Sequence, residues 1–354
     1  MPAIRHLCTA FAMLAFAGQA YAAPSCTWAS TAGPLSYYID LGAPWVARDA
    51  PIGTLIGTVQ TFATPEVTGR EIRCVNDGTG TLTFQASPTG ALYPGPLPQV
   101  GPWDVNGKVM ETGIKGVGLY IRLGFPFNGA GSNTFTPTDD VAIPYTGENN
   151  RDSGVTPLQI KELYSTMALI KTGPIPTGRQ FFSGQMVRSQ ISFLGDALNI
   201  HVSGVVQQAH CTLLANPVSA DPVQLGTYTL ADFTGPGSYT DAKDFYVTLS
   251  DCRDDPAGGI ASAYIRLEGA KGSVPLEPAQ GVFSLDNKPG SATGIGIQLL
   301  RSNDSPMPLQ QNEAVTPLVV DKTVLHFKAR FFQTAPTVTA GPANGALDFT
   351  MTYR

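Results

Sequence analysis

The segment from Thr323 to Arg354, at the end of the sequence, constrains the fold more than any other. It holds two runs of alternating apolar and polar residues around a Pro- and Gly-rich turn: Leu325, Phe327, Ala329 and Phe331, then Leu347, Phe349, Met351 and Tyr353. A period of two is typical of a half-buried strand. The second strand reaches the last residue of the sequence, so no following segment covers its far edge. Because proteins normally blunt or cover an exposed apolar edge, we expect this edge to receive a strand from another molecule.

The composition favours an all-β protein. Glycine and proline are abundant, at 38 and 29 of 354 residues, and charged residues make up only 14%. These values favour many short strands and turns over long amphipathic helices. The formal net charge is −5 and the basic residues are scattered, so we expect no nucleic-acid partner. The length predicts about two domains.

Residues 1–22 have the pattern of a signal peptide. Arg5 provides a basic start, residues 7–16 form a short apolar core, and Ala20-Tyr21-Ala22 fits a small-residue cleavage site. The apolar run is too short to span a bilayer. We therefore expect an exported mature chain that begins at Ala23.

Four segments together resemble the pilin subunits that the chaperone–usher pathway assembles. They are NIHVSGVVQQAHC, which ends at Cys211, YVTLSDC, which ends at Cys252, FSLDNKPGSATGIGIQLL, and the terminal strand with Tyr353 as its penultimate residue. Their order and the two cysteines make the resemblance specific, and it covers roughly residues 197–354. It implies an Ig-like sandwich that lacks its last strand.

The upstream residues contain strand-like runs of their own, such as SYYIDLG and GVGLYIRLGF. Residues 157–173 have loosely helical leucine spacing, but we interpret their second half as a strand because it ends in a Gly-Pro turn. A β domain before a pilin domain resembles the two-domain tip adhesins of chaperone–usher fimbriae. The expected fold is all-β, with two β-sandwich domains: a signal peptide (1–22), an N-terminal lectin-like adhesin domain (23–194) and a C-terminal incomplete Ig-like pilin domain (195–354).

Four of the five cysteines remain once the signal peptide is removed: Cys26, Cys74, Cys211 and Cys252. Four cysteines allow three pairings. We favour Cys26–Cys74 and Cys211–Cys252, because these pairs enclose loops of similar length and each lies in its own half of the chain. Closing a loop of this size stabilises a protein by roughly 4 kcal/mol in the chain-entropy model.

The resemblance implies a groove between the first and last strands of the pilin domain. Its edges are expected along these residues: Ile200, Val202 and Val206 on one side, and Phe349, Met351, Tyr353 and Arg354 on the other. An added strand gains affinity from backbone pairing and selectivity from alternate side-chain pockets. The implied partners are a periplasmic fimbrial chaperone, an outer-membrane usher and the next fimbrial subunit. In the alternative interpretation, both strands belong to a complete sandwich.

The sequence gives no sign of an enzyme or of a cofactor. The mature chain keeps three histidines, His201, His210 and His326, and none lies in residues 23–194, which excludes a histidine-based zinc site there. No CxxC, GxSxG, HExxH, P-loop or EF-hand pattern occurs. We expect neither catalysis nor a bound metal.

The strongest clue to a ligand is the pair Asn76-Asp77, which follows Cys74 by two residues. In the mannose-binding tip adhesin of type 1 fimbriae, an Asn-Asp pair in this position contacts the sugar, and such side chains suit sugar hydroxyls. The alternative is an ordinary Asn-Asp-Gly turn. That family also presents an aromatic residue at its mature N-terminus, whereas cleavage here leaves Ala23, which argues against mannose.

Two long polar loops, near residues 87–108 and 126–154, supply the other candidates for sugar contact. They are Trp103, Asp104 and Asn106 in the first loop, and Tyr145, Asn149, Asn150 and Asp152 in the second. Trp103 has a second interpretation as an apolar plug beneath its loop, and the second loop as a solvated surface segment.

The sequence thus predicts a fimbrial tip adhesin, exported through the periplasm to the bacterial cell surface. Its N-terminal domain is expected to bind a surface receptor, a carbohydrate above all, and its pilin domain to join the fimbria by donor-strand complementation. The alternative is a structural or initiator tip subunit without receptor-binding activity.

Overall fold

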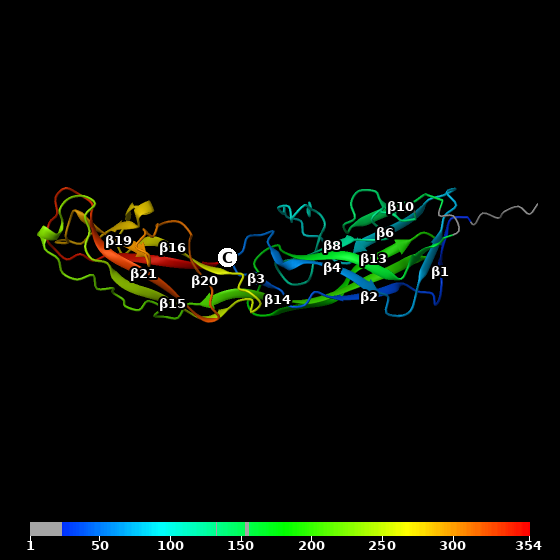
Figure 1. The fold of residues 1–354 in the computed structure, drawn as a ribbon, viewed down its shortest axis with the longest axis horizontal. Helices are drawn as coiled ribbons and strands as arrows, with labels where there is room; N and C mark the ends of the chain where they lie inside the picture. Colours follow the sequence, from blue (N-terminus) through cyan, green and yellow to red (C-terminus); the bar gives the residue numbers. More distant parts are fainter. Residues whose placement is uncertain (1–22, 132, 153–155) are drawn as a thin grey trace, which may run out of the picture.

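The computed structural model describes residues 23–131, 133–152 and 156–354; the expected signal peptide lies outside them. In these residues the regular structure is almost all strand, and the two helices are short 3-10 turns, η1 (Leu230–Asp232) and η2 (Pro278–Gln280). Figure 1 shows an elongated molecule with two β bodies end to end, joined by the long strand β14 (Gly195–Thr212). Within the described residues, no helix is long and apolar enough to cross a membrane. The all-β fold expected from the sequence is confirmed.

The N-terminal body consists of the strands that precede β14 and the first part of β14 itself. They are β1 (Ser25–Trp28), β2 (Leu35–Asp40), β3 (Trp45–Ala47), β4 (Leu55–Pro65), β5 (Ile72–Val75), β6 (Leu82–Pro88), β7 (Val109–Glu111), β8 (Val117–Leu123), β9 (Thr136–Pro137), β10 (Tyr145–Asn149), β11 (Leu158–Ile160), β12 (Glu162–Lys171) and β13 (Gln180–Ile191). Residues 162–171 are thus a strand, as the Gly-Pro turn after them indicated.

Two larger sheets face each other in this body. One has the order β4-β12-β8-β7, and the other runs through β9-β10-β6-β13-β14, with β2 parallel to β14. Their inner faces form one core, in which Tyr37, Phe84, Phe127 and Phe135 are fully buried. A small third sheet, β1-β5-β11, carries the Cys26–Cys74 disulfide between register partners.

The C-terminal body consists of the end of β14 and the strands that follow it. They are β15 (Lys243–Arg253), β16 (Ser262–Ala270), β17 (Pro275–Glu277), β18 (Val282–Ser284), β19 (Ile295–Arg301), β20 (Glu313–Pro317), β21 (Asp321–Gln333) and β22 (Ala346–Tyr353). One sheet has the order β17-β18-β19-β21-β15-β14 and the other the order β20-β16-β22. The Cys211–Cys252 disulfide joins β14 to β15. Both disulfides therefore follow the pairing that we favoured.

Strand β14 belongs to both bodies. Its residues from Ala197 to Val206 pack in the N-terminal core, whereas Ala209 and Cys211 pack in the C-terminal core. The sequence placed the boundary before Gly195, but core membership changes between Val206 and Ala209. We propose that the two domains meet inside this strand. The chain's C-terminus lies at the middle of the molecule, near β3 and β14 (Figure 1).

Candidate functional site

An apolar groove opens into the core of the C-terminal body. Its two edges are residues 217–225 on one side and residues 345–349 on the other. Between them lie core side chains such as Val247, Ile265 and Phe327. The cavity has a volume of about 530 Å³, and a second cavity of about 440 Å³ continues it past Leu225 and Ile297. An apolar groove along the edge of a strand suits an extended peptide segment.

The groove exists because one place in the sandwich has no strand. β22 pairs with β16 along its length and is the last strand of its sheet. On the opposite sheet, β15 pairs with β14 only near the disulfide, and farther along it meets residues 213–225 at a single bridge, Val218↔Val247. Pro217 and Pro222 in that segment lack an N–H to donate, so a regular ladder cannot form there.

The groove narrows toward the end of the chain. Along β22, Leu347 and Phe349 are half-buried, whereas Met351 and Tyr353 are 7% and 1% exposed. Of the predicted edge residues, only Phe349 lines the cavity itself. Met351 and Tyr353 fill the closed end, and Arg354 is exposed while its backbone N–H and C=O pair with Ser262.

The prediction that Ile200, Val202 and Val206 form the other edge is wrong. These three side chains are fully buried in the N-terminal core, where β14 pairs with β13 on one side and β2 on the other. The true edge comes about twenty residues later. The sequence signal for it is weak, since only Val223 and Leu225 alternate in a segment broken by two prolines.

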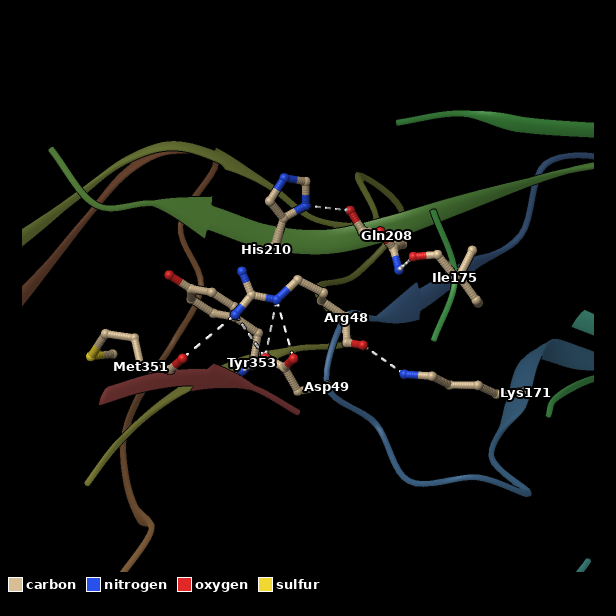
Figure 2. Close-up of polar contacts among 8 residues, drawn as sticks. All are labelled: Arg48, Asp49, Lys171, Ile175, Gln208, His210, Met351 and Tyr353. Atoms are coloured by element: carbon tan, nitrogen blue, oxygen red, sulfur yellow. Dashed lines mark hydrogen bonds and ion pairs between the residues drawn. The ribbon is translucent and has the colours of Figure 1, made fainter. Parts of the chain in front are cut away.

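The closed end of the groove is held by the N-terminal body (Figure 2). The N–H of Asp49 donates to the C=O of Tyr353 at 3.0 Å, and the N–H of Tyr353 donates to Asp49 Oδ2 at 2.8 Å. The Arg48 guanidinium lies 4.6 Å from the centre of the Tyr353 ring and pairs with Asp49 at 2.9 Å. Lys171 Nζ donates to the Arg48 C=O, and burial lowers the pKa of Lys171.

The pair Asn76-Asp77 lies in a turn next to the Cys26–Cys74 disulfide. Asn76 is 2% exposed, and its side-chain amide donates to the C=O groups of Gly80 and Asn149. Asp77 is half-buried and accepts hydrogen bonds from the N–H and the hydroxyl of Thr79, which lower its pKa. Asn76 therefore holds the turn, while the Asp77 carboxylate stays accessible.

The predicted residues of the second loop lie beside this turn. Asp77 and Asp152 form an isolated bridge, which brings the two loops together at the end of the molecule that carries β1 and β10 (Figure 1). Asn149 is buried and donates to Asn133 Oδ1, and Asn150 and Asp152 are exposed. Tyr145 belongs to the core, where its hydroxyl donates to the Phe127 C=O and burial raises its pKa. We call Asp77, Asn150 and Asp152 the distal polar surface.

Trp103, Asp104 and Asn106 do not join this surface. Asn106 and Asp104 hydrogen-bond within their own loop, through contacts with each other and with the backbone of Leu97. Trp103 packs on Tyr120 and beneath Arg122, beside a small apolar cluster over β8. Its position matches the interpretation as a plug rather than a sugar platform.

The three histidines lie in three different settings. His201 stacks on Tyr38 with ring centres 4.6 Å apart, and His326 lies against Tyr246. His210 lines a pocket between the two bodies, which the sequence did not reveal. In the described parts of the chain, no three His, Cys, Asp or Glu residues are grouped to hold a metal ion.

The fold and the groove define a class of protein, a β-sandwich subunit with an unfilled place for one strand. The family model described as fimbrial protein matches residues 200–354. The chain is 35% identical over 157 residues to the fimbrial subunit type 1 of Salmonella typhimurium, covering 44% of this chain and 81% of that protein. This chain belongs to the fimbrial protein family, whose members are exported to the cell surface.

A second relative matches almost the full length. The fimbria adhesin protein of Klebsiella pneumoniae is 27% identical over 352 residues, which cover 98% of each chain. Among solved structures, the CupB6 tip adhesin from Pseudomonas aeruginosa aligns over 94% of this chain and 95% of its own. Its identity is 14% and its TM-score is 0.37. The full-length sequence match extends the resemblance to the N-terminal body.

Proposed function

We propose that this protein is the tip adhesin of a chaperone–usher fimbria. The observation that carries the proposal is the apolar groove at the edge of β22. In the periplasm a chaperone strand would fill this groove, and at the outer-membrane usher the N-terminal segment of the next subunit would replace it. Each occupant would gain backbone hydrogen bonds along β22 and bury apolar side chains on Phe327 and its neighbours.

The N-terminal body supports a position at the tip. A subunit inside a fibre must accept one strand and donate another. The segment before the C-terminal body cannot be donated here, because residues 195–206 are already paired with β13 and β2. A subunit that accepts a strand and donates none ends the fibre.

For receptor binding we propose the distal polar surface. It lies at the end of the molecule opposite the groove, where it would face outward from the fibre (Figure 1). Carboxylate and amide groups in exposed loops suit the hydroxyls of a carbohydrate. The full-length similarity to a protein named as an adhesin favours this function over that of a structural tip subunit.

The groove is tested by a matched pair of substitutions, Phe349→Asp and Phe193→Asp. Phe349 lines the groove, whereas Phe193 is 70% exposed in the turn between β13 and β14. A charge in the groove should prevent capture by the co-expressed chaperone, and the same charge at Phe193 should not. Equal co-purification of both variants would contradict the groove.

The receptor surface is tested with the mature chain, held by its chaperone where it needs one, on an array of glycans. Asp77→Asn keeps an oxygen that accepts the Thr79 hydrogen bonds but removes the charge. Loss of a charge-assisted hydrogen bond should weaken a bound sugar roughly tenfold or more, while Thr79→Val should change affinity little. An array without any bound glycan would instead favour a structural tip subunit.

A further inference from the structure

A pocket of about 360 Å³ lies where the two bodies meet. Trp45, Arg179 and Gln208 line it from the N-terminal side and His210, Asp251 and Arg253 from the C-terminal side. Neither the groove nor the distal polar surface includes any of these residues. We call this cavity the junction pocket. Its volume is within the range of small-molecule sites, roughly 300–1,000 Å³.

The charges that line the junction pocket favour an anion. Arg179 lies in the turn before β13, and Arg253 is the last residue of β15. Neither arginine forms an ion pair with another residue that the structure describes. Asp251 is the single acidic group in the lining. The Arg179 guanidinium lies 5.6 Å from the centre of the Phe181 ring, a contact that uses none of its N–H donors. A guanidinium presents a planar fork of donors that matches a carboxylate or a sulfate.

The remaining lining suits a sugar rather than a bare ion. Trp45, on β3 beside Gln207, is half-buried against the C-terminal core and lines the pocket with an indole, a side chain on which the apolar surface of a sugar ring can pack. Gln208 is 5% exposed, and its Nε2 donates to the Ile175 C=O at 3.2 Å (Figure 2). Its Oε1 is buried with no hydrogen-bond partner in the described structure. A buried amide oxygen without a donor is unfavourable unless a water or a ligand hydroxyl supplies one.

We propose that the junction pocket binds one residue of an acidic saccharide. The anionic group, a carboxylate or a sulfate ester, pairs with Arg179 and Arg253, the ring packs on Trp45, and a hydroxyl donates to Gln208 Oε1. This goes beyond the proposed receptor surface, since it places a second saccharide site at the other end of the N-terminal body. The bound residue would contact both bodies at once and fix them against each other.

The test measures binding of three trisaccharide or disaccharide probes to the mature full-length chain, in complex with its chaperone if it needs one. The probes are 3′-sialyllactose, lactose 3′-sulfate and neutral lactose, titrated by calorimetry. At least one anionic probe should bind about tenfold or more tightly than lactose. Which one does so distinguishes a carboxylate from a sulfate. If neither anionic probe binds better than lactose, the proposal is wrong.

Variants locate the site. Arg253→Gln and Arg179→Gln should each weaken the anionic probe about tenfold, whereas Asp251→Asn should strengthen it because it removes the opposing charge. Arg188→Gln is the matched control, because Arg188 is exposed on β13 and this substitution changes the net charge by the same amount. Unchanged melting temperatures would show that the variants fold. Equal weakening by Arg188→Gln would mean a nonspecific charge effect and overturn the proposal.

Discussion

The two bodies of this protein have the same kind of architecture but differ in how their cores are closed. Each is a sandwich with one disulfide. In the N-terminal body, Phe84 stacks on Phe127 with ring centres 4.2 Å apart, inside a core that the two larger sheets enclose. In the C-terminal body, the core around Phe327 opens to the groove. One core is closed by its own chain, and we propose that the other is completed by a strand from a partner.

Where the two bodies meet, the edge of β22 is partly covered. At the closed end of the groove, Asp49 hydrogen-bonds to the free edge of β22 at Tyr353, which is what a partner strand would do farther along. The N-terminal body thus covers one end of the edge that the C-terminal body leaves open. We therefore expect the backbone of β22 to resist local unfolding more strongly toward Tyr353 than at its open end.

The largest contrast should come from removing each disulfide. The two loops span 48 and 41 residues, so each bond should contribute about the same, roughly 4 kcal/mol. The double substitution of Cys26 and Cys74 by Ala should leave a protein that the chaperone still captures. The same change at Cys211 and Cys252 should abolish capture, because an open core has less stability to lose. Limited proteolysis and chaperone co-purification measure both outcomes, and equal behaviour would remove the contrast.

The next effect concerns Tyr353, which is 1% exposed at the closed end of the groove. Tyr353→Ala should destabilise the C-terminal body by about 3 kcal/mol, as expected for truncation of a buried aromatic side chain. Chaperone capture should be lost, and deletion of Tyr353 and Arg354 should be as severe. Tyr353→Phe keeps the ring and serves as the control. Normal co-purification of the Ala variant would show that the terminal strand is not needed for capture.

A smaller effect should follow from breaking the contact between the bodies. Asp49→Ala removes the acceptor for the Tyr353 N–H and the partner of Arg48, and should cost about 1–2 kcal/mol. Asp49→Asn keeps one acceptor oxygen and should cost less. Hydrogen exchange at the Tyr353 amide reports the change directly. If that amide exchanges equally slowly in the Ala variant, Asp49 does not protect the edge of β22.

The strands and disulfides of this fold were predictable because their signals are local. Alternation of apolar residues is visible in β21 and β22, and the cysteines divide the chain into two loops of similar length. The groove edge was misplaced for the same reason. Residues 200–206 alternate as clearly as an edge strand would, and alternation does not reveal which core a strand faces. Only the pairing of β14 with β2 and β13 decides that.

For the candidate site, too, the sequence predicted some residues but not how they are grouped. The sequence singled out Asn76 and Asp77 by their spacing from Cys74. It did not reveal that Asn76 is buried while Asp77 is accessible. The bridge between Asp77 and Asp152 joins segments far apart in sequence, as does the junction pocket. Such groupings depend on how loops fold over the sheets, which no local pattern records.

The smallest expected effect lies on the closed body, where a loop covers the outer face of β8. Asp140 accepts a hydrogen bond from Lys108 at 2.9 Å and lies 3.3 Å from Arg122. Partial burial alone would raise the pKa of Asp140, but these two cations lower it overall. Since the pKa is lower in the folded state, the stabilisation is present above the unfolded value of 3.8 and is lost as the pH falls through the folded value. Asp140→Asn should cost about 1 kcal/mol or less at pH 7.

The difference between Asp140→Asn and the parent chain should begin to shrink below about pH 4, because Asp140 of the unfolded parent then binds a proton, and should vanish once the folded parent is protonated too. Asp139→Asn is the control, since Asp139 is exposed and forms no ion pair with any residue the structure describes. Thermal unfolding at pH 7 and pH 3, followed by circular dichroism, measures the difference. A gap that stays constant with pH would show that packing, not charge, holds this loop. Because its core is already closed, the N-terminal body should keep its fold in either case.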